Sequence, residues 1–260
     1  RLVRDGHSVR ALDCFTSYYA RTLKEKNAEA VKAAGAEFLE CDLAVDDLTP
    51  AMRGIDMVFH FAGQPGISAA TGFDTYVRNN IVATERLLGA SENAGVHAGF
   101  INIATSSVYG DHADRDETAE PKPNSYYGVT KLAAEQLALA RWRATGFPAT
   151  SLRIFSVYGE RERPDKLYHA LARAIFEEKE FKLHEGSRDH VRSFTYVGDV
   201  VDGCMLAMNA MDLCRGEIFN IGSDTTHTTG EGINLIEELT GKKARFVQVP
   251  PRLGDQVVTK

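Results

Sequence analysis

A tyrosine and a lysine, Tyr127 and Lys131, stand four residues apart in a stretch with a helical pattern. Residues at this spacing share one face of a helix, so the lysine ammonium can lie near the tyrosine oxygen. A nearby cation favours the phenolate and lowers a tyrosine pKa that is about 10 in water. The pair predicts a tyrosine that acts as a general base near neutral pH. The same spacing is also common on surface helices, so its meaning depends on its neighbours.

Hydroxyl groups form a second candidate feature. The sequence TSSVYG, residues 105–110, directly follows the apolar run FINIA. Side chains at the carboxyl end of a parallel strand face the crevice in which such sheets bind ligands. A hydroxyl-rich turn is the other interpretation of this stretch taken alone. The threonine at the strand end and the tyrosine–lysine pair are together more specific than either one.

Asp13 is a candidate for binding a nucleotide cofactor. It ends the alternating stretch HSVRALD, residues 7–13, which is typical of a strand. A carboxylate at this tip can accept both ribose hydroxyls of an adenosine and repels a 2′-phosphate, which favours NAD over NADP. The other interpretation is a turn or N-cap aspartate.

Four of the arginines in the C-terminal half are candidates for binding an anion, in a chain whose formal net charge is −6: Arg153, Arg163, Arg192 and Arg252. Guanidinium groups match the geometry of phosphate and carboxylate, so a cluster of them could hold a nucleotide diphosphate. Any single arginine is more often a solvated surface charge.

The elements that must position these residues alternate between strand and helix. We expect strands at 37–40, 57–61, 99–104, 149–155 and 217–221, and helices around 76–94, 126–145 and 168–178. This alternation predicts an α/β fold in which helices cover both faces of a doubly wound parallel sheet. After about residue 155 the alternation loosens, which indicates a second, smaller lobe. Residues 1–6 are typical of a helix end closed by Gly6, so we expect a further strand and turn to precede them.

Composition excludes several other classes. Of the 260 residues, 43% are hydrophobic and 25% charged, as in ordinary globular proteins. There is no long basic run, so we expect no nucleic-acid partner. The apolar stretches are far shorter than the roughly 20 residues that span a bilayer. The four cysteines are scattered, which favours reduced thiols in a cytoplasmic protein over disulfides or a metal site.

Taken together, these stretches resemble the extended short-chain dehydrogenases/reductases that act on nucleotide sugars. The matching segments, in the order of that family, are D13-CF, D42-L, HFAGQ (60–64), NNIVAT (79–84), TSSVYG, YYGVTK (126–131), LRIFSVYG (152–159), ERPD (162–165), RSFTYVGDV (192–200), NIG (220–222) and RLGD (252–255). The resemblance implies a Rossmann-type domain over residues 1–155 that binds NAD. It also implies a smaller nucleotide-sugar-binding lobe, mainly residues 156–260, from which some segments return to the first domain. It further implies that the phosphate-binding glycine loop lies upstream of residue 1 and that further elements follow residue 260.

The resemblance also assigns roles to residues. The implied catalytic residues are Thr105, Tyr127 and Lys131. The implied NAD-binding residues are Asp13, Asp42, Leu43, Ala62, Gly63, Gln64, Asn80, Tyr127, Lys131 and Phe155. The implied substrate-binding residues are Ser106, Ser107, Ser156, Arg163, Arg192, Arg252 and Asp255. It gives Arg153 no such role, so we expect Arg153 to be structural.

The shared first step of this family is oxidation of the sugar at C4. Relatives that are 4,6-dehydratases carry Asp-Glu after the catalytic threonine, and UDP-glucuronate decarboxylases carry Ser-Glu. This chain has Ser106 and Ser107 there, and neither can act as a carboxyl acid or base. A 4-epimerase needs no third acid or base, and the Thr-Ser-Ser triplet is similar to that of UDP-glucuronate 4-epimerases. Residues 13–24 are also similar to those enzymes, and Arg163 could pair with the sugar carboxylate.

Three alternatives stay open. QPGIS (64–68) lacks the arginine that UDP-glucuronate 4-epimerases usually have at its last position, so UDP-glucose/UDP-galactose is the next substrate candidate. UDP-glucuronate decarboxylation is the second alternative. The third is a non-catalytic NAD-binding sensor, although such relatives typically lose the tyrosine or the lysine. The resemblance also implies a homodimer in which the helices around 76–94 and 126–145 pair across a two-fold axis.

Overall fold

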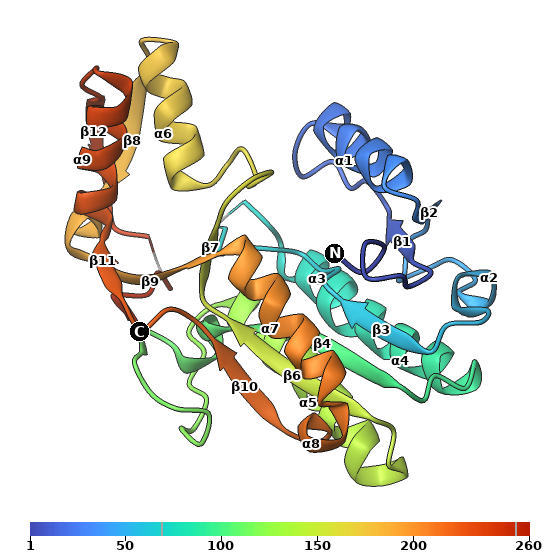
Figure 1. Cartoon of the computed structure of the whole chain (residues 1–260). Coiled ribbons are helices and arrows are strands. Elements are labelled where there is room, and N and C mark those ends of the chain that lie inside the picture. The colour runs from blue at the N-terminus through green and yellow to red at the C-terminus, as the bar shows by residue number, and fades with distance from the viewer. Residues whose placement is uncertain (69, 253) are drawn as a thin grey trace.

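The computed structural model describes residues 1–68, 70–252 and 254–260. Its main sheet is parallel and has four strands in the order β10-β6-β4-β3, formed by Ile218–Ile221, Ala149–Ile154, Gly99–Thr105 and Met57–His60. Beside it, β1 (Arg10–Asp13) and β2 (Glu37–Glu40) pair in parallel as a separate two-stranded sheet (Figure 1). This confirms the predicted α/β fold with a parallel sheet.

Helices cover both faces of the main sheet, as Figure 1 shows. One face is covered by α3 (Phe73–Tyr76), a π-helix η1 (Val77–Val82), α4 (Ala83–Asn93) and α5 (Tyr126–Thr145), and the other by α7 (Val197–Asn209) and α8 (Met211–Cys214). All seven residues of β4 are buried, because Phe100 packs in the core on one face while Ile101 and Ile103 pack in the core on the other. Burial on both faces is the reason for the unbroken apolar run in this strand.

The remaining N-terminal elements are short or peripheral. They are α1 (Arg21–Ala33), α2 (Thr49–Met52), the 3₁₀ turn η2 (Ser106–Tyr109) and β5 (His112–Ala113). Residues 2–6 form hydrogen-bonded turns that end at Gly6, whose φ of +91° suits a glycine.

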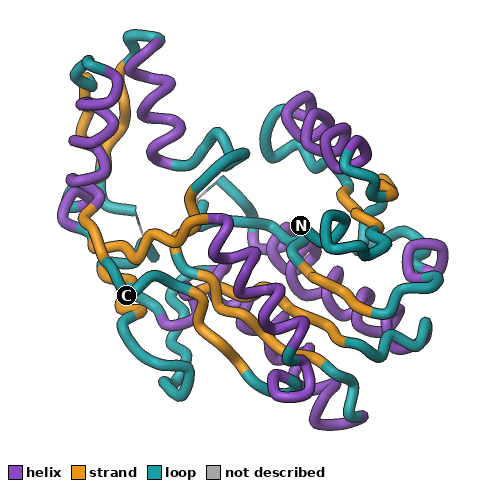
Figure 2. The backbone as a smooth tube through the Cα atoms, viewed as in Figure 1, coloured by secondary structure: helices purple, strands orange, loops and turns teal. Residues whose placement is uncertain are grey.

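Beyond β6, most of the chain forms an outer lobe. It contains β7 (Ser156–Tyr158), α6 (Leu167–Phe176), β8 (Glu180–His184), the 3₁₀ turn η3 (Ser187–Asp189), β9 (Val191–Tyr196), β11 (Thr226–Thr228), α9 (Thr229–Thr240), β12 (Arg245–Val249) and β13 (Val258–Thr259). Helices α6 and α9 pack on the β8–β12 pair through a core that includes Leu171, Leu183 and Ile233. The tube in Figure 2 shows this lobe rising from one end of the main sheet, while α7, α8 and β10 return to that sheet.

Two local differences from the expected elements bear on the site. The expected helix over 76–94 is divided, because its first part adopts π-helical turns at 77–82 before the regular α4 begins. The expected strand over 149–155 ends at Ile154, and Phe155 separates it from β7. Insertions of π-helical turns into α-helices are frequently found at functional sites.

Candidate active site

The end of β4 fixes Thr105 and the serines that follow it. The Thr105 hydroxyl oxygen accepts a hydrogen bond from the backbone N–H of Ser107 (3.1 Å) and donates one to Ser107 Oγ (3.3 Å). Ser106 is tied elsewhere, because its hydroxyl donates to Gln256 Oε1 (3.3 Å). All three side chains are buried. The turn therefore holds Thr105 and Ser107 as one hydroxyl pair and anchors Ser106 to the C-terminal segment.

Helix α5 begins directly against this turn. The side chain of Ser125 caps it by accepting a hydrogen bond from the N–H of Gly128 (3.1 Å). A Cβ atom on Gly128 would lie 2.6 Å from the carbonyl oxygen of Ser107, so only glycine allows this approach. The close contact brings Tyr127, the residue before Gly128, to the Thr105 hydroxyl, whose interaction lowers the tyrosine pKa.

Opposing influences act on the pKa of Tyr127. Burial is the largest influence and raises the pKa of Tyr127, while Thr105 and the positive charge of Arg163 lower it. Lys131 is buried, which lowers its own pKa to about 8, and Glu135 acts in the opposite direction. Spacing along a helix could not foresee this outcome, because it says nothing of burial.

Glu135, on α5, forms a buried ion pair with Arg153 of the main sheet. The guanidinium of Arg153, on β6, donates to both oxygens of Glu135 at 2.9 Å and 2.7 Å, and both side chains are at most 1% exposed. Arg153 also donates to the hydroxyl of Tyr109 (2.7 Å). The expectation that Arg153 is structural agrees with this arrangement, which joins α5 to the sheet.

The π-helix η1 places Asn80 under the loop that follows β3. The Asn80 amide oxygen accepts from the backbone N–H of Gln64 (2.6 Å), and its amide nitrogen donates to Thr130 Oγ1 on α5 (3.0 Å). A Cβ on Gly63 would lie 2.8 Å from Asn80 Oδ1, so this position also requires a glycine. Asn80 thus connects residues 63–64 to the helix that carries Tyr127.

The other residues expected to bind NAD lie around the ends of the strands, with one exception. Asp13 is exposed at the end of β1, where its carboxylate accepts from the N–H of Phe15 (2.7 Å). The pKa of Asp42 is lowered because hydrogen bonds from Arg78 and the N–H of Ala44 outweigh its partial burial. Ala62 is exposed and Phe155 is buried. The exception is Leu43, whose side chain belongs to the core between the sheet and α4.

Arg163 reaches toward the catalytic residues from the loop between β7 and α6. It pairs with Asp165 (Nη2–Oδ2, 3.5 Å), and its Nη2 would lie 3.5 Å from a Cβ on Gly66. Its Nη1 atom is buried and has no hydrogen-bond partner among the described residues. A buried donor of this kind is costly to leave unpaired, so Nη1 is suited to an anionic ligand.

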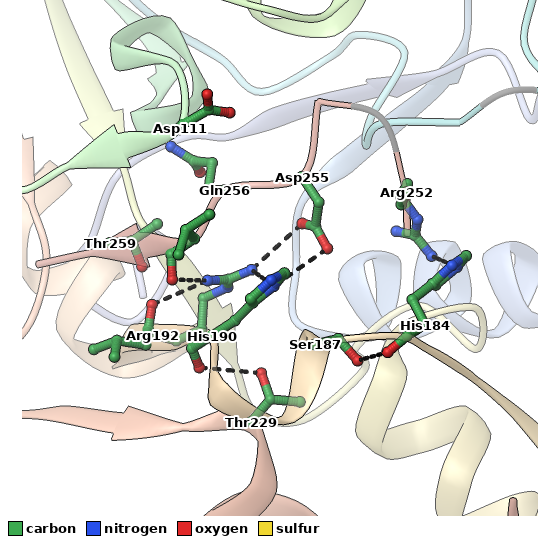
Figure 3. Close-up of polar contacts among 12 residues, drawn as sticks. Asp111, His184, Ser187, His190, Arg192, Thr229, Arg252, Asp255, Gln256 and Thr259 are labelled. Carbon is green, nitrogen blue, oxygen red and sulfur yellow. Dashed lines mark hydrogen bonds and ion pairs between the residues drawn. The ribbon is translucent and has the colours of Figure 1, made fainter. Parts of the chain in front are cut away.

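Arg192 and Asp255 form the polar cluster drawn in Figure 3. Arg192 Nη2 lies 3.3 Å from Asp255 Oδ1 and 3.3 Å from His190 Nδ1, and His190 Nδ1 lies 3.6 Å from Asp255 Oδ2. Burial lowers the pKa of Arg192, while the charge of Asp255 raises it. The carboxylate of Asp255 thus helps to hold the arginine in place.

Arg252 lies in the same part of the lobe, next to a second histidine. Its Nη2 is 3.4 Å from His184 Nε2, and His184 Nδ1 is 2.6 Å from the carbonyl oxygen of Pro250 (Figure 3). Leu253, in the RLGD stretch, lies outside the described residues. Ser156 is half-buried at the start of β7. The structure therefore pairs Arg192 with Asp255 and places Arg252 in a separate contact with His184. Sequence reasoning did not single out His184 or His190.

The described residues fit a dinucleotide such as NAD. Asp13 presents an exposed carboxylate at a strand end. The lack of a side chain at Gly63 leaves room beside Asn80. Lys131 provides a buried cation on the face of α5 that also carries Tyr127. Elsewhere in the described chain, no cluster of three metal-ligating side chains occurs and no helix is long and apolar enough to cross a membrane.

The chain is similar to known proteins over most of its length. The model of the NAD dependent epimerase/dehydratase family matches residues 1–222. An uncharacterized UDP-glucose epimerase of Bacillus subtilis is 34% identical over 242 residues, covering 92% of this chain and 76% of that protein. UDP-glucuronate 4-epimerase 2 of Arabidopsis thaliana is 30% identical over 279 aligned positions, covering 98% of this chain and 63% of that protein.

Among solved structures, the chain is similar to UDP-glucuronic acid 4-epimerase from Bacillus cereus, crystallised with UDP-glucuronic acid and NAD. The TM-score is 0.93 with 33% sequence identity, and the match covers 99% of this chain and 83% of that one.

Proposed function

This chain belongs to the NAD-dependent epimerase/dehydratase family, and we propose that it epimerises UDP-glucuronate at C4 to give UDP-galacturonate. The observation that carries the substrate assignment is the position of Arg163. Its charge acts on Tyr127, and its Nη1 is buried without a partner among the described residues. A sugar whose C4 hydroxyl meets Tyr127 would bring its C5 carboxylate toward this guanidinium.

In the proposed reaction, each site residue of this chain has a separate role. Tyr127 takes the proton from the 4-hydroxyl, while Thr105 donates a hydrogen bond to the same oxygen. NAD held in this site would supply the redox chemistry at C4, a reversible hydride transfer that allows either face of the sugar to react. Tyr127 then gives its proton back to the 4-oxygen, so that no atom is gained or lost. Lys131, with Asn80 and Gln64, would hold the nicotinamide end of the cofactor, and Asp13 and Asp42 its adenosine end.

The two lobes would bind the two ligands. We assign NAD to residues 1–155 and the nucleotide sugar mainly to residues 156–260, where Arg192 and Arg252 would hold the diphosphate and Asp255 a ribose hydroxyl. The contact of Arg192 with Asp255, and the position of Arg252 in the same lobe beside His184, support this assignment. A cytoplasmic location is part of the proposal, supported by the thiols of Cys41, Cys204 and Cys214 that pack in the core.

The proposed homodimer uses an apolar face on α3–α4 and α5. The rings of Phe73 and Tyr126 contact each other in a tilted arrangement with centroids 4.9 Å apart, and both are exposed. Val82 and Val129 on the same helices are also exposed, at 40% and 44%. Sedimentation at micromolar concentration tests this, and a monomer would contradict it.

The function is tested by a proton NMR time course of the protein with UDP-glucuronate and NAD. We expect new anomeric signals of UDP-galacturonate, which Tyr127→Phe should abolish. A UDP-pentose product would identify a decarboxylase instead. Bound NAD without turnover of any UDP-sugar would favour a sensor.

UDP-glucose/UDP-galactose is the second candidate. It is favoured by Ser68, which stands where UDP-glucuronate 4-epimerases usually have an arginine. The relative in Bacillus subtilis is also named a UDP-glucose epimerase. Turnover of UDP-glucose without turnover of UDP-glucuronate would establish this alternative.

A further inference from the structure

Two loops that are distant in sequence meet beside the catalytic residues. One follows β1 and leads from Asp13 into α1, and the other joins β7 to α6. Figure 1 shows the two loops approaching one another above the sheet. Their contact is made by Tyr18 in the first loop with Arg163 and Asp165 in the second.

Tyr18 contacts this loop in two ways. Its hydroxyl donates to Asp165 Oδ2 (3.2 Å), the same oxygen that pairs with Arg163 Nη2 at 3.5 Å. Its ring faces the Arg163 guanidinium, whose central carbon lies 5.3 Å from the ring centroid. A cation at this distance from an aromatic face is attracted to it.

Gly66 lies next to the Arg163 guanidinium. A Cβ there would lie 3.5 Å from Arg163 Nη2 and 3.8 Å from the Tyr18 hydroxyl. Gly66 is itself fixed, because its carbonyl oxygen accepts a hydrogen bond from the buried Tyr76 (2.7 Å). Arg163 is thus confined by Tyr18, Asp165 and Gly66.

The contacts leave one part of Arg163 available. Nη2 pairs with Asp165, and the guanidinium carbon lies over the Tyr18 ring, whereas Nη1 is buried and has no hydrogen-bond partner among the described residues. An arginine has several rotatable bonds, so holding it in a single conformation before a ligand arrives reduces the entropy lost on binding. The ring of Tyr18 supplies this restraint without using the donor that the ligand needs.

We propose that Tyr18 is a positioning residue that holds Arg163 ready for the sugar carboxylate, and thereby sets the preference for a uronic-acid nucleotide sugar over a neutral one. The proposal rests on the proposed function, because it takes Arg163 to be the carboxylate ligand. It assigns to a residue of the cofactor-side loop an effect on substrate selectivity.

The test compares the NAD-loaded wild type with Tyr18→Phe and Tyr18→Ala. The phenylalanine keeps the ring beneath Arg163 and loses only the bond to Asp165, while the alanine loses both contacts. Tyr19→Ala is the matched control, because Tyr19 lies in the same loop but its ring faces Lys24 Nζ at 4.5 Å. Dissociation constants for UDP-glucuronate and UDP-glucose are measured by calorimetry, and KM and kcat by NMR.

We expect Tyr18→Ala to weaken UDP-glucuronate relative to UDP-glucose by about 10-fold, the effect of losing a desolvated cation–π contact. The change should appear in Kd and KM more than in kcat. Tyr18→Phe should change the ratio of the dissociation constants for UDP-glucuronate and UDP-glucose by a smaller factor, and Tyr19→Ala should not change it. In an Arg163→Gln background, Tyr18→Ala should not change the ratio further, because the group that it positions is gone.

An unchanged ratio in Tyr18→Ala would overturn the inference, as would equal losses for both sugars, which indicate a general disturbance of the loop. Independent effects of Tyr18→Ala and Arg163→Gln would do the same. Failure of the proposed function can be distinguished from failure of this inference, because it appears in the wild type as an absence of UDP-galacturonate. The ratio of dissociation constants needs no turnover and still tests Tyr18 in that case.

Discussion

Glu135 and Arg153 form a two-pronged ion pair inside the protein, with N–O distances of 2.9 Å and 2.7 Å and almost no exposure to solvent. The pair joins the helix that carries Tyr127 and Lys131 to the central sheet. Ser151 adds a hydrogen bond to the same carboxylate (3.3 Å). The charge of Arg153 is thus matched within the core, and the cost of burying it is offset only while Glu135 is present.

Replacement of Glu135 by glutamine should destabilise the protein by about 3–5 kcal/mol, because it leaves the Arg153 charge buried and unpaired. Urea unfolding at pH 7 measures the effect. The control is Glu25→Gln, which breaks the exposed pair with Arg21 and should cost less than about 1 kcal/mol. Equal losses in the two variants would show that the buried pair has no special importance.

Lys131 should make stability depend on pH in a defined window. Its pKa falls from 10.5 in the unfolded chain to about 8 in the folded protein. Between these values the unfolded chain binds more protons, so this group makes stability rise as pH rises from about 8 to 10.5. Below about pH 8 both states are protonated, and the penalty is constant at about 3 kcal/mol.

The variant Lys131→Met removes this ionisable group. We expect it to be more stable than the wild type at pH 7 and to lose part of the rise in stability between pH 8 and 10. Urea unfolding of both proteins without cofactor, at four pH values, measures the difference. Parallel curves for the two proteins would contradict the lowered pKa.

His190 should make diphosphate binding depend on pH. Burial and the charge of Arg192 lower its pKa in the free protein, while Asp255 raises it. A bound diphosphate adds negative charge and raises the pKa of His190 again, so binding takes up a proton and strengthens as pH falls. Calorimetry with UDP-glucose between pH 5.5 and 8 measures this, since its diphosphate does not titrate there.

His190→Asn should flatten that pH dependence, whereas His97→Asn should not, because His97 is exposed and bonds only the nearby carbonyl of Gly95. A pH dependence that persists unchanged in His190→Asn would assign the proton to another group. His184, beside Arg252, is then the next variant to test.

Gly128→Ala should reduce kcat more than it changes folding. The added Cβ would meet the Ser107 carbonyl oxygen at 2.6 Å, so the start of α5 must move away from the turn that holds Thr105. A displacement of this size at a catalytic pair can lower the rate by about 100-fold. Gly89→Ala, in α4 with nothing within 4 Å of the new atom, is the control and should stabilise the helix by about 1 kcal/mol or less. Similar rates in the two variants would refute the role of this contact.

Much of the framework could be predicted from the sequence. Strand 37–40 and helix 126–145 have the expected bounds, and the caps Ser125 and Gly146 mark the two ends of the helix. The sheet and the strand-end position of Thr105 followed from the same pattern. These features depend on local sequence.

The parts that could not be predicted depend on packing between distant segments. The π-helical turns around Asn80 leave the apolar pattern of the helix unchanged, so nothing in the sequence signals them. The positive charge of Arg163, from another lobe, lowers the pKa of Tyr127, and no pattern in the sequence indicates this. The contact between Tyr18 and Arg163 likewise exists only in the folded chain.

The hydrogen bonds of Gln256 have a consequence for how the sugar turns over during epimerisation. Its amide nitrogen donates to the carbonyl oxygens of Ser106 (3.1 Å) and Gly110 (3.0 Å), and its neighbour Asp255 contacts Arg192. Gln256 and Asp255 therefore connect the turn that carries Thr105 to Arg192, which is proposed to hold the diphosphate. Because these contacts fix the two ends of the site relative to each other, we expect the sugar to present its second face by rotation about bonds within the nucleotide sugar. The protein itself need not move in this step.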